Sequence, residues 1–173
     1  RKCKIYLLHG SMTEEEMTTL YQHPKIKALV SLAHGEGFGL PIYEAAYNEL
    51  PVIAPDWSGH IDFLYKSVKD KKTGKEKPRG HFAKVKYTLQ PVQREAVWDG
   101  VLQADSMWCF ADQGSYKMRL REVYKDYDRF KSQAKKLNKH IRKNLTAENQ
   151  YKKFCDVVSK YVEVEEETPL VFG

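Results

Sequence analysis

Two glutamates, Glu36 and Glu44, enclose a glycine-rich stretch and are the residues in this sequence best placed to do chemistry. Gly37 and Gly39 lie between them and let the backbone come close to a ligand. Pro41 fits the first turn of a helix, whose free N–H groups attract an anion. Carboxylates repel phosphate but accept hydrogen bonds from hydroxyls. The pattern therefore favours a ligand with a phosphate centre and hydroxylated ends, such as a nucleotide sugar.

The residues around this stretch predict the elements that position it. An apolar, β-branched run at 26–31 predicts a buried strand before the glycines, and residues 52–54 predict the next strand. In an open α/β sheet, the order strand, loop, helix, strand places the loop at the carboxyl end of a strand, where ligands bind. We therefore expect both glutamates to point into one crevice of a Rossmann-like α/β fold, a parallel sheet flanked by helices.

Residues 5–64 resemble the donor-binding domain of retaining glycosyltransferases of the GT-B fold, a large family that includes glycogen synthase-like and mannosyltransferase-like enzymes. Glu36 and Glu44 look like the E-x7-E motif of that family. Residues 5–10 resemble its strand that ends in glycine, and residues 51–54 resemble its next strand. The resemblance implies the C-terminal half of a family-four (glycosyl transferases group 1) enzyme, incomplete on its N-terminal side.

The resemblance also implies a role for each matching residue. Glu36 would be catalytic, contacting hydroxyls of the donor sugar near the anomeric carbon, and Glu44 would bind the two ribose hydroxyls. The other expected substrate-binding residues hold phosphate, sugar and base, and they are Gly10, Ser11, Gly37, Phe38, Gly39, Leu40, Ser58, Gly59 and His60. Hexosyl transfer would retain the anomeric configuration without a metal or another cofactor, because backbone dipoles and basic residues stabilise the leaving phosphate.

The partners implied by the resemblance are a nucleotide-sugar donor and an acceptor that is a glycan, a lipid or a protein. The family also carries an acceptor-binding domain and two further strands before the segment that matches Ile5. We therefore expect this chain to be the donor-binding part of a larger enzyme and to transfer no sugar by itself. The base and the sugar of the donor do not follow from the sequence.

Two alternatives stay open, a non-catalytic binding or assembly module of Rossmann-like shape and a basic nucleic-acid-binding domain. The net charge of +6 suits anionic partners in general, including nucleotide sugars and nucleic acid. The basic loop at 66–80 is expected to project into solvent, but no aromatic residue lies among its lysines, so nucleic acid is not the expected partner. The carboxylate pair favours the enzyme, because neither alternative needs two acids beside a glycine loop.

Length and composition set the remaining bounds. The chain has 173 residues, 42% apolar and 30% charged, which is enough for one domain with its own core. The three cysteines, Cys3, Cys109 and Cys155, are far apart and lack metal-type spacing, so we expect reduced thiols and a cytoplasmic protein. No apolar run approaches the ~18 residues of a membrane span, although the basic surface would suit an anionic membrane surface.

The pattern along the chain predicts one domain at 1–162 and an acidic tail at 163–173. Strands are expected at 4–9 and 81–89, and helices at 13–22 and 95–104. The segment 115–162 is expected to be helical, with helices beginning at Ser115, Asp128 and Thr146. Residues 61–65 are expected to form either a short helical turn or the start of an extended arm before the basic loop.

The missing strands lead to a prediction about association. Apolar strands cannot leave backbone groups unpaired in a dry interior, and an open sheet edge invites pairing. The last helix would also expose an apolar face, formed by Tyr151, Phe154, Val158 and Val162. We predict that the isolated chain self-associates through that edge or that helix. Light scattering that gives a monomer mass over a wide concentration range would contradict this, and residues 5–8 would then be expected to pair with 26–31.

Overall fold

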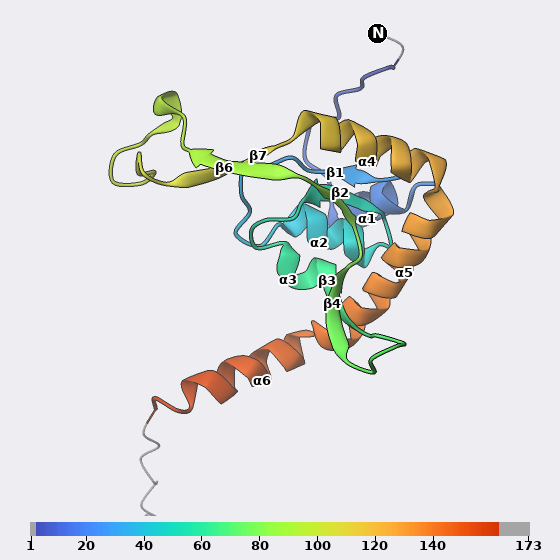
Figure 1. Ribbon diagram of the computed structural model, residues 1–173, viewed down its shortest axis with the longest axis vertical. Coiled ribbons are helices and arrows are strands. Elements are labelled where there is room, and N and C mark those ends of the chain that lie inside the picture. The colour runs from blue at the N-terminus through green and yellow to red at the C-terminus, as the bar shows by residue number, and fades with distance from the viewer. Residues whose placement is uncertain (1–2, 163–173) are drawn as a thin grey trace, which may run out of the picture.

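The computed structural model describes residues 3–162, and its centre is a small parallel sheet with helices on both faces (Figure 1). The strand order is β1-β2-β5, with β1 at Leu29–Val30, β2 at Val52–Pro55 and β5 at Ala83–Val85. Both pairings are parallel, so the carboxyl ends of all three strands lie at the same edge. This confirms the predicted α/β class with a Rossmann-like sheet.

Strand β2 divides the core because its side chains alternate between the two faces. Val52 and Ala54 belong to the cluster on one face, together with apolar residues of α2 and α5. Ile53 belongs to the cluster on the other face, where Val123 and Phe130 cover the sheet. Every residue of β2 is buried, which explains why its sequence is a continuous apolar run rather than an alternating one.

Helices make up much of the described chain, and their bounds are α1 (Glu14–Gln22), α2 (Leu40–Tyr47), α3 (Ile61–Leu64), α4 (Gln113–Lys125), α5 (Tyr127–Asn144) and α6 (Ala147–Val158). The predicted capping box of α1 is confirmed, with Thr13 and Glu16 each accepting a hydrogen bond from the backbone N–H of the other. Thr146 caps α6 as predicted.

Two predicted N-cap positions were wrong, Ser115 by three residues and Asp128 by two. Asp112, not Ser115, caps α4, because its carboxylate accepts a hydrogen bond from the Ser115 N–H at 2.6 Å. The Ser115 hydroxyl is instead used against the sheet, where it accepts a hydrogen bond from the Lys86 N–H at 2.9 Å. The helix predicted to begin at Asp128 follows directly on Asp126.

Two antiparallel hairpins leave the central sheet. The first joins β3 (Tyr65–Lys69) to β4 (Glu76–Gly80) and confirms a projecting basic segment after the short helix α3. The second joins β6 (Tyr87–Pro91) to β7 (Met107–Ala111). The strand predicted at 81–89 is therefore divided, because the backbone of Lys86 turns from the sheet to bond Ser115 and the Asp112 N–H.

The strand predicted at 4–9 is not formed in the structure. Ile5, Tyr6, Leu7 and Leu8 are between 65% and 89% exposed and have no strand assignment. Strand propensity reflects packing against neighbours more than an intrinsic preference of the backbone, and no described strand lies beside this segment. The outer edge of β1 pairs with no described strand either, so the pairing of residues 5–8 with 26–31, expected only for a monomer, is not formed here.

The helix predicted at 95–104 was also wrong. A single 3₁₀ turn spans Arg94–Ala96, and Trp98 then pairs with Leu102 across a tight turn. Gly100 has φ 75°, a left-handed conformation that closes this turn and interrupts a helix. Trp98 and Val101, which gave this segment its helical spacing, are exposed.

The last helix, α6, extends away from the body of the molecule (Figure 1). Tyr151, Phe154 and Val162 of the predicted apolar face are exposed, and Val158 is half-buried. The predicted acidic tail at 163–173 lies outside the described residues.

Candidate functional site

The glycine-rich loop between β1 and α2 is held at its beginning by the second hairpin. The Cys109 N–H donates a hydrogen bond to the His34 carbonyl at 3.0 Å. The His34 Nδ1–H donates to the Cys109 carbonyl at 2.7 Å. The imidazole also stacks on Trp108, with ring centroids 4.8 Å apart and planes inclined by 5°. His34 therefore anchors the loop to β7.

The middle of the loop is held by the turn that follows β2. The Ser58 hydroxyl accepts a hydrogen bond from the Glu36 N–H at 2.8 Å and donates one to the Glu36 carbonyl at 2.7 Å. The Gly59 N–H donates to the same carbonyl at 3.0 Å. Ser58 adopts a left-handed backbone conformation, φ 80°, which is uncommon for a residue with a side chain. The hydrogen bonds to Glu36 stabilise it.

Gly59 is required for this contact between the loop and the turn. A Cβ atom at Gly59 would lie 1.9 Å from the Gly37 carbonyl oxygen, so no other residue fits without separating the two backbones. Gly39 has φ 86°, and a Cβ there would lie 3.1 Å from the Cβ of His60. The loop residues Glu36, Gly37 and Gly39 are therefore brought together with residues 58–60, as the sequence suggested.

Helix α2 begins directly after this loop and has a free N-terminus. Gly39 is the N-cap residue and offers no side chain, and no acidic residue occupies the first turn. The first amides of a helix have no intrahelical acceptor, and their dipoles favour an anion. Phe38 and Leu40, beside this N-terminus, are exposed. The first amides of α2 are therefore free to meet an anion, and phosphate binding at this place stays a prediction.

Glu44 lies on α2 and faces α1. Its Oε2 accepts a hydrogen bond from the Tyr21 hydroxyl at 3.0 Å. Burial, and then the hydrogen bond and charge of Glu44, raise the pKa of Tyr21 to about 12, so the phenol stays a donor at neutral pH. Oε1 makes no hydrogen bond with another described residue and is open to a ligand hydroxyl.

A cavity of about 560 Å³ lies between α1 and α2 beside Glu44. It is lined by Met12, Glu14, Met17, Thr18, Tyr21, Tyr43, Glu44, Tyr47 and Asn48. Gly10 and Ser11 are exposed and immediately precede Met12, so the chain passes from them into the wall of this cavity. Glu36 is half-buried in the loop and does not line the cavity.

His60 lies against the loop at Gly39. It is 3% exposed, and its Nε2–H donates to the Pro55 carbonyl at 2.8 Å. Because a carbonyl only accepts, Nε2 carries the proton and Nδ1 is left as an acceptor. Nδ1 is buried and has no partner among the described residues.

Sequence reasoning missed a polar cluster at the carboxyl end of β2. Lys84 of β5 pairs with Asp56 at 3.1 Å, and the Tyr65 hydroxyl donates to the same carboxylate at 2.7 Å and 2.8 Å. Hydrogen bonds and charge from Tyr65 and Asp56 outweigh burial and raise the pKa of Lys84. The three residues are separated in sequence, and no spacing signal indicates their contact. The cluster ties the base of the first hairpin to the sheet.

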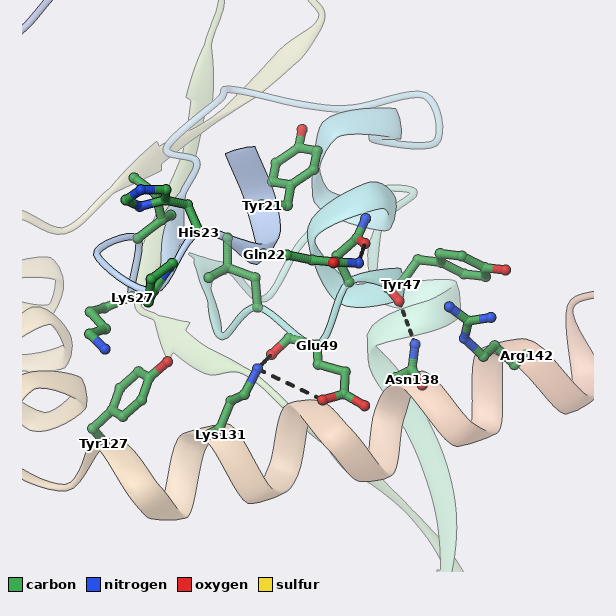
Figure 2. A pocket seen from close by; sticks show the side chains of 14 residues that line it. Tyr21, Gln22, His23, Lys27, Tyr47, Glu49, Tyr127, Lys131, Asn138 and Arg142 are labelled. Atoms are coloured by element: carbon green, nitrogen blue, oxygen red, sulfur yellow. Dashed lines mark hydrogen bonds and ion pairs between the residues drawn. The ribbon is translucent and has the colours of Figure 1, made fainter. Parts of the chain in front are cut away.

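Another cavity, of about 650 Å³, lies at the opposite end of the sheet (Figure 2). Its polar groups satisfy one another, since Asn138 donates to the Tyr47 carbonyl and Lys131 donates to the Glu49 carbonyl at 2.8 Å. Arg142 lies over the Tyr47 ring. These contacts fasten α5 to the end of α2. Because ligands of open α/β sheets bind at the carboxyl ends of the strands, this cavity is the weaker candidate.

The described residues 3–162 contain no group of three or more histidine, cysteine or acidic side chains that could hold a metal ion. In the same range, no helix is both long enough and apolar enough to cross a membrane.

The parallel sheet, the helices on both faces and the glycine loop at the carboxyl end of β1 define an open α/β domain of the Rossmann-like class. The model of the family described as Family 4 Glycosyltransferase in conflict systems matches residues 13–154. The chain belongs to this family and carries a glycosyltransferase-type domain. Searches of curated proteins and of solved structures found no match.

The contact between the loop and the turn yields a stability prediction. Gly59→Ala is expected to lower the free energy of unfolding by about 1–3 kcal/mol, because the methyl group must push the Gly37 carbonyl away. Gly37→Ala is the matched control, since a Cβ there meets no atom within 4 Å. Urea denaturation followed by circular dichroism measures both. Equal stabilities of the two variants would show that the contact is not tight.

Proposed function

We propose that this chain binds the nucleotide-sugar donor of a retaining glycosyltransferase through the loop before α2 and through Glu44. The observation that carries the proposal is the uncapped N-terminus of α2 at the carboxyl end of β1, with a carboxylate on the same helix facing a 560 Å³ cavity. The family supports transfer of a sugar in general.

The proposed pose uses each part of the site once. The diphosphate lies against the amides of the loop and the start of α2, where the helix dipole favours negative charge. The ribose hydroxyls donate to the free Oε1 of Glu44. The base extends along the α1–α2 cavity toward Gly10, Ser11 and Met12.

Glu36 is the proposed catalytic residue. Ser58 and Gly59 hydrogen-bond both the N–H and the carbonyl of Glu36, so its half-buried side chain leaves the loop from a defined position. Its carboxylate would contact hydroxyls of the donor sugar, and the leaving phosphate would be stabilised by the backbone dipoles at α2. Ser58, Gly59 and His60 then act mainly by holding the loop, although they were predicted as direct substrate ligands.

Donor binding tests the role of Glu44. Glu44→Gln is expected to weaken binding of the matching nucleoside diphosphate by about 1–3 kcal/mol, since an amide accepts ribose hydroxyls less strongly than a carboxylate. Calorimetry with a panel of nucleoside diphosphates measures this, and Glu15→Gln is the control because it removes an exposed acid of α1 outside the cavity. Equal affinities of wild type and Glu44→Gln would exclude this role for Glu44.

Turnover tests the role of Glu36 separately. Glu36→Gln is expected to lower the rate of donor turnover much more than donor affinity, because its contacts tighten as charge develops on the sugar. Release of nucleoside diphosphate from the sugar donor, measured in an enzyme that includes the acceptor-binding domain, gives kcat. A normal kcat in this variant would rule out the catalytic assignment.

A further inference from the structure

The first hairpin and α5 enclose a second polar cavity, of about 390 Å³, that the donor site does not use. Strands β3 and β4 form one wall, and α5 forms the other. The cavity is lined by Lys66, Ser67, Val68, Lys69, Arg79, Gly80, His81, Gln133 and Lys136. We call this the hairpin cleft. None of its residues belongs to the glycine loop or to the α1–α2 cavity.

All the charged residues that line the hairpin cleft are basic. The pairing of Lys66 with Arg79 in the β3–β4 register puts both side chains on the same face of the hairpin. Lys136 comes from α5, and His140 follows one turn later on the same face of that helix. Residues from two elements far apart in the sequence therefore concentrate positive charge in one concave place.

The two acids of the hairpin do not line this cleft. The Asp70 carboxylate accepts hydrogen bonds from the Lys72 and Thr73 N–H groups in the turn, at 2.8 Å and 3.0 Å. Glu76 lies opposite Lys69 in the strand register, but it does not line the cleft and forms no ion pair in the described range. Lys66, Arg79 and Lys136 form no ion pair with any other residue in the described range.

The pKa values of His81 and His140 are both lowered in part by the basic residues of the cleft. Burial lowers the pKa of His81, and the charges of Lys66, Arg79 and Lys136 lower it further, against a hydrogen bond from Nδ1 to the Arg79 carbonyl. Burial and then Lys66 lower the pKa of His140 in the same way. Such a concentration of like charge attracts an anion of matching size.

The positive surface continues past the cleft along the hairpin. Exposed lysines follow one another there, at Lys69, Lys71, Lys72, Lys75 and Lys77. Figure 1 shows this hairpin projecting from the body of the molecule. A compact anion would fill the cleft alone, whereas a chain of phosphates could occupy the cleft and the hairpin together.

We propose that the hairpin cleft and the projecting hairpin bind the phosphodiester backbone of nucleic acid. No Phe, Tyr or Trp side chain lines the cleft, so the contact is to phosphates rather than to stacked bases, and a duplex suffices. A concave cleft admits a ridge of phosphates, which a flat lipid surface does not provide. In the sequence, the lack of aromatic residues in the basic loop spoke against binding through stacked bases, and it does not bear on contacts with phosphates. The structure also places Lys136 of α5 beside the hairpin.

Binding of a short fluorescein-labelled DNA duplex to the full chain, measured by anisotropy over a series of salt concentrations, tests the proposal. The cleft variant combines Lys66→Gln, Arg79→Gln and Lys136→Gln. The control variant removes the same residue types from α4, with Lys117→Gln, Arg121→Gln and Lys125→Gln, all exposed and outside the cleft. Both variants have the same net charge, and circular dichroism verifies their folding.

The cleft variant is expected to bind DNA about tenfold or more weakly than the control, and the slope of log K against log salt should be shallower by about 2–3. Equal affinities for the two variants would overturn the proposal, because only overall charge would then matter. Binding of inorganic phosphate, measured directly by calorimetry, or pelleting with phosphatidylserine vesicles, in the absence of measurable DNA affinity, would overturn it in favour of a small anion or a membrane surface. Donor binding is independent of these results, since the two sites share no residue.

Discussion

The described structure depends on one close backbone contact, in which the loop before α2 rests on the turn after β2. The Glu36 carbonyl accepts hydrogen bonds from both the Ser58 hydroxyl and the Gly59 N–H. Because Gly59 has no side chain, the turn packs directly against the backbone of Gly37. Hydrogen bonds fix the loop at two points, Glu36 and His34, so its backbone amides keep one orientation. A preorganised set of amides is what an anion site needs, because little ordering remains to be done when the ligand arrives.

The core places that contact at the correct edge of the sheet. β2 is buried on both faces, and its alternating side chains fix the strand between the α2 and α4 layers. The turn at Ser58 follows β2 directly, and the glycine loop follows its parallel neighbour β1. Parallel pairing therefore brings the two segments together, and α5 secures the far end of α2 through Lys131 and Asn138. The same helix forms one wall of the hairpin cleft, so packing on α5 positions both proposed binding surfaces.

Local signals predicted much of this arrangement, and contacts between distant residues explain the rest. The Thr13 capping box, the α2 helix after the glycines and the buried β2 strand are encoded within a few residues and were confirmed. The strand at residues 5–8 failed because propensity cannot supply a neighbouring strand, and the helix at 95–104 failed because Gly100 closes a turn. The Asp56–Lys84–Tyr65 cluster and the approach of Lys136 to the hairpin join residues far apart in sequence, so no spacing pattern could reveal them.

The central claim is that the loop before α2 receives the phosphates of a nucleotide-sugar donor. Amide chemical shifts of the full chain, followed by NMR while each nucleoside diphosphate is titrated, test it most directly. We expect saturable shifts at Gly37, Gly39 and Leu40, together with residues of the α1–α2 cavity such as Met17 and Glu44. Shifts confined to the hairpin cleft, around Lys66 and Arg79, or no shifts with any nucleotide, would contradict it.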